Sequence, residues 1–235
     1  MLYVIGDVHG MLDELKVLHG LIMRHSNKFD EPHQIIMLGD YIDRGPDSKG
    51  VLDFLMSEPF TGFKHVFLRG NHEQMLVDAS EGYNVNMFLA NGGIQTIDSF
   101  GGICYIDDQV YEPYKKWIKT LPHHYIHGNF IFVHAGLDPR KLFRDNTNED
   151  KMWIRDVFLK SDDVFKYKGE SMTVIHGHTP TFYDPHTKDK NTPVPVVKPN
   201  RINLDTGSVF TKTLTCLIIK DNVAYGFLSN KKRKK

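Results

Sequence analysis

Five short apolar runs are spaced along the chain, and glycine and polar residues follow each of them directly. The runs are residues 2–5, 35–38, 65–68, 130–133 and 172–175. Runs of this length that end at a turn-forming segment are typical of buried strands. Since run and polar segment come in the same order five times, we expect the strand ends to meet at one edge of a sheet, where open α/β sheets bind ligands.

Helical periodicity fills the segments between the first runs. Apolar positions recur at near-helical spacing in residues 11–24 and again in residues 46–56. This alternation of strand, loop and helix predicts parallel pairing in the first third of the chain. Residues 74–127, called the insertion below, contain no such polar segment. We predict that the insertion is mostly helical, with turns at residues 91–93 and 101–102, and that substrate specificity is built there.

The C-terminal third follows a different pattern. Residues 180–201 are rich in proline and predict a long loop that helps to shape substrate access. Residues 213–220 and 223–228 predict an antiparallel hairpin. Because the polar segments of both halves must meet at one site, we expect a single domain over residues 1–229, followed by a basic, disordered tail at residues 230–235.

The polar segments contain a full set of metal-binding side chains. The candidate ligands are Asp7, His9, Asp40, Asn71, His134 and His178. These oxygen and imidazole donors suit Mn, Fe or Zn better than Cu(I) or a closed structural zinc site. Six ligands are too many for one catalytic ion. They suit two divalent ions, with Mn²⁺ favoured, that lie about 3.5–4 Å apart across a bridging carboxylate and convert a water to a hydroxide nucleophile.

Residues next to these ligands carry further chemistry. His72 follows Asn71 directly and is the candidate general acid, because an alkoxide leaving group needs a proton. Asp43 lies three residues after Asp40 and is the candidate partner that orients His72. Arginine grips two phosphate oxygens with a planar fork, and the candidates for that role are Arg44, Arg69 and Arg155.

The order Gly-Asp-x-His-Gly, Gly-Asp-x-x-Asp-Arg-Gly, Gly-Asn-His-Glu, His-Ala-Gly and Gly-His-Thr resembles the PPP family of metallophosphoesterases. The short chain, together with segments such as Asn91-Gly92-Gly93, is more similar to the bacterial and phage members than to eukaryotic catalytic subunits. The resemblance implies the α/β fold of calcineurin-like phosphoesterases. That fold is a central β-sandwich of mixed sheets flanked by helices, with a two-metal site at the carboxyl ends of the strands.

The resemblance also implies a role for each site residue. One ion would be held by Asp7, His9 and Asp40, and the other by Asp40, Asn71, His134 and His178. His72 matches the family's acid and Asp43 its partner. Arg44 and Arg155 match the phosphate-binding arginines, and Arg69 is an arginine of the bacterial type.

Three nearby residues each have two alternative roles. We favour His178 over His176 as the ligand, because His176 lies at a strand end where its side chain can face the core. Asp205 follows another apolar run, and it is either a group that braces the site or a turn residue. Glu73 is either a partner of the ligands or only the start of a helix.

The expected reaction is hydrolysis of a phosphate monoester by metal-bound hydroxide, with His72 as acid. Two substrate classes share every motif. We favour a serine/threonine protein phosphatase, with phosphotyrosine as a further substrate, because no nucleotide-binding element is evident. The alternative is a dinucleoside tetraphosphate hydrolase. A non-catalytic metal-binding scaffold is a third reading, which the complete set of ligands and acid disfavours.

The composition indicates a packed core, a reducing compartment and a chain without a membrane span. Among 235 residues, 40% are hydrophobic, which is enough for a packed core. Cys104 and Cys216 give no disulfide framework, and we expect both to be buried side chains in a reducing, cytoplasmic compartment. No apolar stretch approaches the roughly 18 residues of a membrane span, and no signal peptide is expected. The net charge is zero, but residues 231–235 are all basic. This tail is expected to be solvated, and its alternative role is contact with acidic partners.

Overall fold

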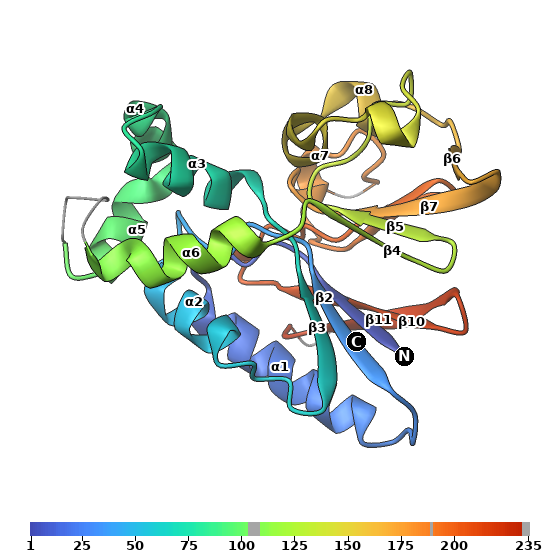
Figure 1. The fold of residues 1–235 in the computed structure, drawn as a ribbon. Coiled ribbons are helices and arrows are strands. Elements are labelled where there is room, and N and C mark those ends of the chain that lie inside the picture. Colours follow the sequence, from blue (N-terminus) through green and yellow to red (C-terminus); the bar gives the residue numbers. More distant parts are fainter. Residues whose placement is uncertain (103–108, 189, 232–235) are drawn as a thin grey trace.

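Two β-sheets form the centre of the molecule in the computed structural model, which describes residues 1–102, 109–188 and 190–231 (Figure 1). The first sheet has the strand order β11-β10-β1-β2-β3. Its strands are β1 (Leu2–Ile5), β2 (His33–Met37), β3 (Phe63–Phe67), β10 (Thr215–Lys220) and β11 (Val223–Ser229). The strands β1, β2 and β3 are parallel, whereas β10 is antiparallel to both β1 and β11.

The second sheet has the order β4-β5-β7-β9-β8. A further short strand, β6, also pairs with β7 and is not part of this linear order. Its strands are β4 (His124–His127), β5 (Phe130–Val133), β6 (Phe165–Tyr167), β7 (Glu170–His176), β8 (Val196–Val197) and β9 (Arg201–Asn203). The strands β5, β7 and β9 are parallel. Both sheets are therefore mixed, with parallel strands in their interiors.

Strand alternation decides which side chains lie between the sheets. Val4 and Ile36 pack with Phe132 and Ile175 of the second sheet, in a core that also contains Leu204. The intervening residues of the same strands face the helices in a separate core, which includes Tyr3, Ile5, Ile35, Leu15 and Leu18. Because successive side chains of a strand point to opposite faces, β1, β2, β3 and β10 of the first sheet contribute to both cores.

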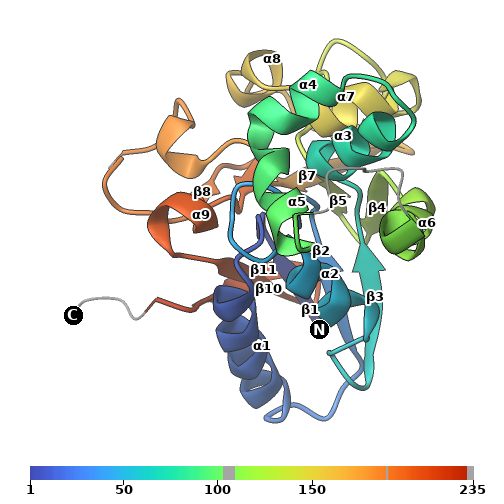
Figure 2. The same ribbon diagram turned by 90° about the vertical axis from the view of Figure 1, so that its left-hand side faces the viewer.

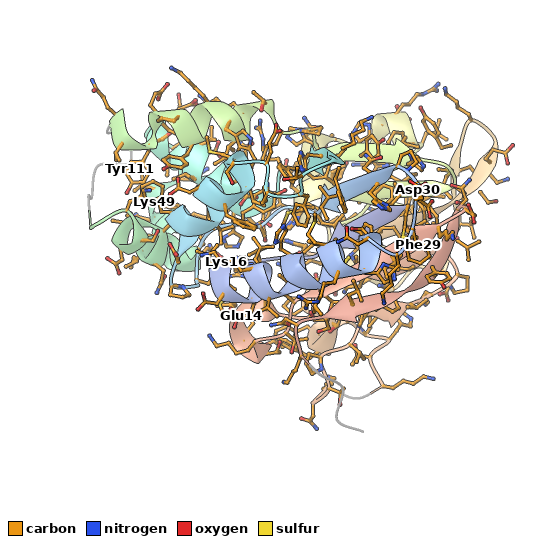
Figure 3. All side chains as sticks on the ribbon, turned by 90° about the horizontal axis from the view of Figure 1, so that it is seen from below. Glu14, Lys16, Phe29, Asp30, Lys49 and Tyr111 are labelled. Atoms are coloured by element: carbon orange, nitrogen blue, oxygen red, sulfur yellow. The ribbon has the colours of Figure 1, made fainter. Side chains whose placement is uncertain are left out.

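Helices cover the outer faces of the sandwich (Figures 1 and 2). On the side of the first sheet lie α1 (Leu12–Ser26), α2 (Ser48–Met56), α3 (Asn71–Ser80), α4 (Val85–Phe88), α5 (Ile94–Ser99) and α6 (Glu112–Thr120). The short helices α7 (Asn148–Trp153), α8 (Asp156–Leu159) and α9 (Ser208–Thr211) come later in the chain. Seen from below, α1 runs alongside the first sheet, with Lys16 on its exposed side (Figure 3).

The predicted strands, parallel pairing and C-terminal hairpin are confirmed, with several corrections. The ligand-bearing strands belong to two sheets, as the sandwich implied by the resemblance requires, and not to the single sheet that the apolar runs alone predicted. At the end of the insertion, which was predicted to be mostly helical, the strand β4 (His124–His127) pairs with β5 across a turn at Gly128, which has φ +54°. The expected turn at residues 91–93 lies within a π-helical segment, η1 (Leu89–Gly93), that is kinked at Gly92. The proline-rich segment contains the 3-10 turn η4 (Thr181–Tyr183) and β8.

Two further expectations concern the cysteines and the membrane. Cys216 is buried, as predicted, and burial raises the pKa of its thiol. Cys104 and residues 232–235 of the tail lie outside the described residues. Within the described residues, every helix is too short or too polar to cross a membrane.

Candidate functional site

The predicted ligands lie on tight loops at the carboxyl ends of the strands. Non-glycine residues with left-handed backbone gather here, including His9 (φ +49°), Asp40 (+54°) and His178 (+68°). Such conformations are strained and persist only where the surroundings hold them. The first two loops hold each other, because the backbone N–H groups of Val8 and His9 both donate to the carbonyl of Asp40.

Four donor atoms converge in one part of the site. His134 Nε2 lies 2.9 Å from Asn71 Oδ1, 3.2 Å from His178 Nδ1 and 3.3 Å from Asp40 Oδ1. His178 Nδ1 lies 2.9 Å from the same Asn71 oxygen. These side chains come from two sheets and one helix terminus, and all four are buried. They match the set that the family resemblance implies for the second ion.

The other oxygen of Asp40 faces a second group. Asp40 Oδ2 lies 3.6 Å from His9 Nε2 and 3.9 Å from His72 Nε2. In this structure Arg44 Nη1 donates to His9 Nε2 at 2.9 Å. Asp7 stands beside this group: its Oδ2 accepts the backbone N–H of His178 at 2.9 Å, while its buried Oδ1 has no partner among the described residues. Asp40 thus lies between both sets of donors.

Backbone carbonyls fix the orientation of two ligand imidazoles. His9 Nδ1 lies 2.8 Å from the carbonyl of Ile42, and His134 Nδ1 lies 2.9 Å from that of Leu38. A carbonyl can only accept, so in both rings Nδ1 carries the proton and Nε2 keeps its lone pair for a metal.

The charge balance of the site fits bound cations. Burial and the carboxylates of Asp205 and Asp40 raise the pKa of Asp7, and burial raises that of Asp205 to about 6. Burial alone would raise the pKa of Asp40, but the imidazoles of His134 and His72 outweigh it and hold that pKa well below its usual range. Divalent ions would satisfy the buried carboxylates and the unpartnered Asp7 Oδ1, while His178 turns Nδ1 toward the donor group.

Glycines let the backbone approach these carboxylates. A Cβ atom on Gly70 would collide with Asp40 Oδ1, and one on Gly177 would collide with Asp7 Oδ1. Any side chain at these two positions would displace a candidate ligand. The glycines of the Gly-Asn-His-Glu and Gly-His-Thr motifs are therefore required by contact distance, beyond the need for a turn.

Glu73 is both a helix-terminal residue and a partner of the ligand loop. Its carboxylate accepts backbone N–H groups of Asp40 at 2.8 Å, Tyr41 at 2.7 Å and Gly70 at 2.9 Å. Burial raises the pKa of Glu73 to about 7. Both alternatives considered for this residue hold, since the carboxylate that caps α3 also fixes the backbone that carries Asp40.

His72 and Asp43 form a close pair. His72 Nδ1 lies 2.6 Å from Asp43 Oδ2, and both side chains are buried. Burial raises the pKa of Asp43 and lowers that of His72 to about 4, with the Asp40 carboxylate opposing the second shift. The pairing leaves His72 Nε2 on the side of Asp40, facing the donor groups.

The three candidate arginines differ in their surroundings. Arg44 contacts His9, as described above, and Arg155 Nη1 donates to Thr179 Oγ1 at 3.0 Å, one residue after His178. Burial lowers the pKa of Arg155, and the nearby carboxylates of Asp40 and Asp7 oppose that shift. Arg69 instead donates to Gln74 Oε1 at 2.9 Å on the flank of α3. Its described contacts do not include the metal-donor group.

Further residues support the site, and one of them, Ser208, was not singled out from the sequence. Ser208 Oγ donates to the carbonyls of Asp7 and Val8 at 2.8 and 2.9 Å, and the Trp153 ring lies edge-on to His178 at 6.1 Å. Thr179 holds Arg155, and its place in the Gly-His-Thr motif was the available signal. Asp205 proves to be a turn residue, because its carboxylate accepts the N–H of Gly207 at 2.9 Å.

The comparison with known families agrees with this geometry. The calcineurin-like phosphoesterase family model matches residues 1–204. The chain belongs to the calcineurin-like phosphoesterases. The PPP-type resemblance of the motifs is supported by a relative, serine/threonine-protein phosphatase 2 of Escherichia coli, which is 40% identical over 92 residues. That match spans 39% of this chain and only 38% of the relative.

Two further comparisons cover more of this phosphoesterase. The asymmetrical bis(5'-nucleosyl)-tetraphosphatase PrpE of Oceanobacillus iheyensis is 28% identical, over 90% of this chain and 86% of the relative. The solved structure of a cold-active protein tyrosine phosphatase has a TM-score of 0.60 at 16% identity, covering 92% of this chain and 73% of that one. The latter likeness shows the fold alone. Membership of the family implies a two-metal site, which the clustered donors can hold.

A buried ion pair anchors the proline-rich loop of the phosphoesterase behind the site. Arg201 and Asp184 are fully buried and joined by two hydrogen bonds, of 2.7 and 2.9 Å. His176 Nε2 lies 3.3 Å from Arg201 Nη1. His176 is therefore part of this network, and His178 alone of the two histidines joins the metal-donor group, as predicted.

We expect Asp184→Asn to lower the free energy of unfolding by about 3–5 kcal/mol, because it leaves the buried Arg201 charge unpaired. Urea denaturation measures this loss. Asp162→Asn, which breaks an exposed ion pair with Lys198, is the matched control and should cost under about 1 kcal/mol. Equal losses in the two variants would contradict a special role for the buried pair.

Acid should weaken the same pair. Burial alone would raise the pKa of Asp184, but hydrogen bonds from Arg201 and the His186 backbone hold it at about 2. A depressed pKa adds stability above the unfolded value, near pH 4, and this stability is lost as pH falls toward 2. Asp184→Asn should remove that part of the acid sensitivity.

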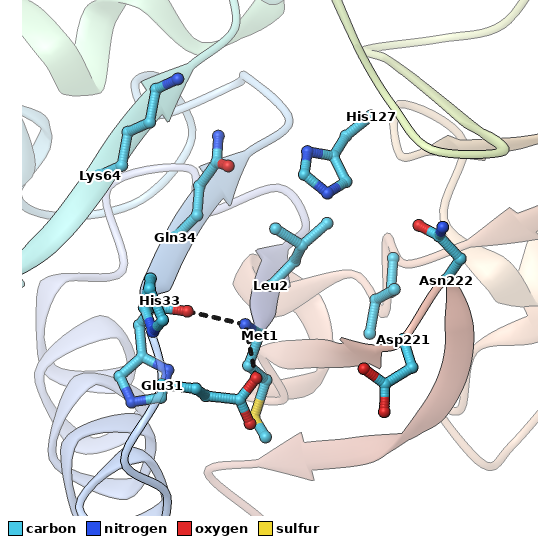
Figure 4. Close-up of a pocket in the computed structure, with 11 residues that line it drawn as sticks. Met1, Leu2, Glu31, His33, Gln34, Lys64, His127, Asp221 and Asn222 are labelled. Carbon is cyan, nitrogen blue, oxygen red and sulfur yellow. Dashed lines mark hydrogen bonds and ion pairs between the residues drawn. The ribbon is translucent and has the colours of Figure 1, made fainter.

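A cavity of about 420 Å³ lies at the other end of the strands (Figure 4). Leu2, Gln34 and Lys64 line it from the starts of β1, β2 and β3, and His127 and Asn222 line it from two hairpin turns. None of the metal-donor residues lines this cavity. The chemistry of the phosphoesterase therefore belongs to the opposite, carboxyl edge of the sheets.

Proposed function

We propose that this chain hydrolyses phosphate monoesters with two divalent ions, for which Mn²⁺ suits the donor set, and that its substrates are phosphoserine and phosphothreonine in proteins. The observation that carries the proposal is the position of Asp40. One of its oxygens faces His134 and the other faces His9 and His72. A carboxylate shared in this way by two groups of donors suits a bridged pair of ions.

Each residue has a proposed part in holding the ions. One ion would be held by Asp7, His9 and Asp40, and the other by Asp40, Asn71, His134 and His178. When bound, the ions would supply a water-derived nucleophile at neutral pH and neutralise charge on the phosphoryl oxygens. Glu73 and Ser208 keep the ligand loops in place through the backbone bonds described above.

The protein's own groups complete the reaction. Arg44 contacts His9 and Arg155 lies near Asp40 and Asp7, so both can grip the equatorial phosphoryl oxygens. His72 protonates the leaving oxygen from Nε2, while Asp43 holds Nδ1. A phosphoryl dianion beside the imidazole favours its protonated form and opposes the effect of burial on its pKa. Arg69 has a lesser role in this scheme, because Gln74 engages it.

The insertion supports a protein substrate. Large apolar side chains are exposed on it, including Tyr83 (66%), Met87 (39%) and Ile94 (53%). The same segment reaches the site, because the Gly92 carbonyl accepts the backbone N–H of Arg44 at 3.1 Å. An apolar surface next to a phosphate-binding arginine suits the residues that flank a phosphorylated side chain. The similarity to a bacterial serine/threonine phosphatase agrees with this substrate class.

A second candidate substrate is a dinucleoside tetraphosphate. The long match to a bis(5'-nucleosyl)-tetraphosphatase favours it. So does a group of aromatic residues, in which Tyr183 is 70% and Phe210 is 62% exposed and Phe182 contacts both rings. Phe210 lies two residues after Ser208, which bonds to the Asp7 loop. Exposed aromatic faces of this kind can stack on a nucleobase.

One comparison of substrates tests the proposal. The protein is stripped with chelator and restored with Mn²⁺, and kcat/KM is measured on phosphothreonine peptides and on diadenosine tetraphosphate. We expect a preference of about tenfold or more for the peptides, which corresponds to about 1.4 kcal/mol. Met87→Ser with Ile94→Ser should lower the rate on peptides, and Tyr183→Ala with Phe210→Ala should not. The reverse preference, with the reverse effect of the two pairs, would contradict a protein phosphatase.

A further inference from the structure

The insertion reaches the proposed acid pair through a single buried hydroxyl. Thr96 of α5 is fully buried, and its Oγ1 lies 2.6 Å from Asp43 Oδ1, across 53 residues of sequence. Asp43 uses its other oxygen, Oδ2, for His72 Nδ1. The hydroxyl therefore occupies the side of the Asp43 carboxylate that His72 leaves free.

The direction of each hydrogen bond follows from counting protons. Thr96 Oγ1 is also 2.9 Å from Ser48 Oγ and 3.0 Å from the backbone nitrogen of Asp43. The hydroxyl has one proton, and a carboxylate oxygen can only accept, so Thr96 donates to Asp43. Ser48 then donates to Thr96, and the Asp43 N–H donates to both hydroxyl oxygens. The result is a chain that runs from Ser48 through Thr96 and Asp43 to His72.

The loop that this chain supports is strained. Asp43 and Arg44 are consecutive non-glycine residues with left-handed backbone, at φ +70° and +69°. Both of their backbone N–H groups are bonded by α5 and its neighbours, Asp43 by Thr96 and Ser48 and Arg44 by the Gly92 carbonyl. Gly92 is needed for this approach, since a Cβ there would lie 2.6 Å from the Arg44 nitrogen. Such a turn keeps its shape only while these contacts hold.

We propose that Thr96 is a positioning residue for the reaction: its hydroxyl fixes the carboxylate of Asp43 so that His72 presents Nε2 to the leaving oxygen. This inference rests on the proposed function, because it assumes that His72 is the acid. Thr96 does not touch the reacting atoms in this account. Losing the hydroxyl would free the Asp43 carboxylate to rotate, and a misplaced proton donor would slow only those substrates whose leaving group needs the proton.

Two aryl phosphates test the proposal independently of the natural substrate. Phenyl phosphate has a leaving group that needs protonation, and p-nitrophenyl phosphate has one that needs it much less. With the Mn²⁺-restored full chain, we expect Thr96→Val to lower kcat on phenyl phosphate by about 10–100-fold. The loss on p-nitrophenyl phosphate should stay below about threefold, and KM should change by less than about twofold on both. Thr96→Ser keeps the hydroxyl and should restore both rates.

Two controls separate positioning from folding. Ser99→Ala removes a hydroxyl from the same helix without touching Asp43 and should leave the ratio of the two rates unchanged. In an Asp43→Asn background, Thr96→Val should change either rate by less than about twofold, because the residue through which it acts is already altered. If Thr96→Val does not fold, Thr96→Ala takes its place beside Thr96→Ser.

The outcomes also distinguish a failure of the role proposed for Thr96 from a failure of the acid role proposed for His72. Equal losses on both aryl phosphates, or a full effect of Thr96→Val in the Asp43→Asn background, would overturn the role of Thr96 alone. If His72→Asn itself lowers both rates equally, the acid assignment falls and the inference falls with it. A selective loss in both His72→Asn and Thr96→Val supports the two together.

Discussion

Replacing His72 by asparagine is expected to lower turnover on alkyl phosphates by about 10²–10⁴, the usual contribution of general acid catalysis. His72 Nδ1 lies 2.6 Å from Asp43, and its Nε2 faces the donor group around Asp40. Asparagine can keep a hydrogen bond to Asp43 but cannot deliver a proton. The loss should be much smaller on p-nitrophenyl phosphate, whose leaving group departs without protonation.

Steady-state kinetics on a phosphothreonine peptide and p-nitrophenyl phosphate measure this difference. His127→Asn makes the same change at an exposed histidine on the far turn between β4 and β5, and both of its rates should match those of the wild type. If His72→Asn loses the same factor on both substrates, His72 is not the acid.

Removal of the metals is expected to abolish activity altogether and to destabilise the fold. Asp7, Asp40 and Asp205 are buried together, and Asp7 Oδ1 has no partner among the described residues. Once the ions are gone, these carboxylates would repel one another, with only the imidazoles of His134 and His72 and the nearby Arg44 to offset their charge. Each ion present at about 1,000 times its Kd would add about 4 kcal/mol to the free energy of unfolding.

Dialysis against chelator, followed by thermal melts and assays with and without Mn²⁺, tests this expectation. Mn²⁺ should restore activity and raise Tm in the wild type. Asp40→Asn, which removes the shared carboxylate charge, should gain little from Mn²⁺ in either measurement. Activity that survives complete removal of the metals would refute the two-metal account.

Much of the site could be predicted because its information is local. Each ligand follows an apolar run by one to four residues, so the strand and the side chain at its end are read together. Asp7, Asp40 and His134 are examples, and the structure brings them together as expected. The glycines beside these ligands were also part of the motifs. The sequence did not show why glycine is required there: Gly70 and Gly177 make room for specific carboxylate oxygens.

The apolar runs alone did not show the division into two sheets, which was predicted only from the family resemblance. The apolar runs of β2 and β5 look alike in sequence, and their assignment to different sheets depends on pairing partners far along the chain. The strand β4 was hidden within the insertion, because His124–His127 has two histidines and only partly buried side chains. Its pairing with β5 across Gly128 supplies the regularity that its sequence lacks.

The supporting residues were missed for a related reason. Thr96 contacts Asp43 over 53 residues, and Ser208 contacts the Asp7 carbonyl over 201. Serine and threonine are common, and neither residue lies in a motif that marks it. Only the packing of α5 and α9 against the ligand loops reveals what these hydroxyls do. Arg69 shows the opposite case, since a motif drew attention to an arginine that the structure engages with Gln74.

The most direct test of the account is anomalous diffraction from crystals of the Mn²⁺-loaded protein. We predict two peaks about 3.5–4 Å apart with the Asp40 carboxylate between them. One peak should lie against His9 and Asp7, and the other against His134 and His178. A single peak, or a pair of peaks that do not share Asp40, would contradict the two-metal centre.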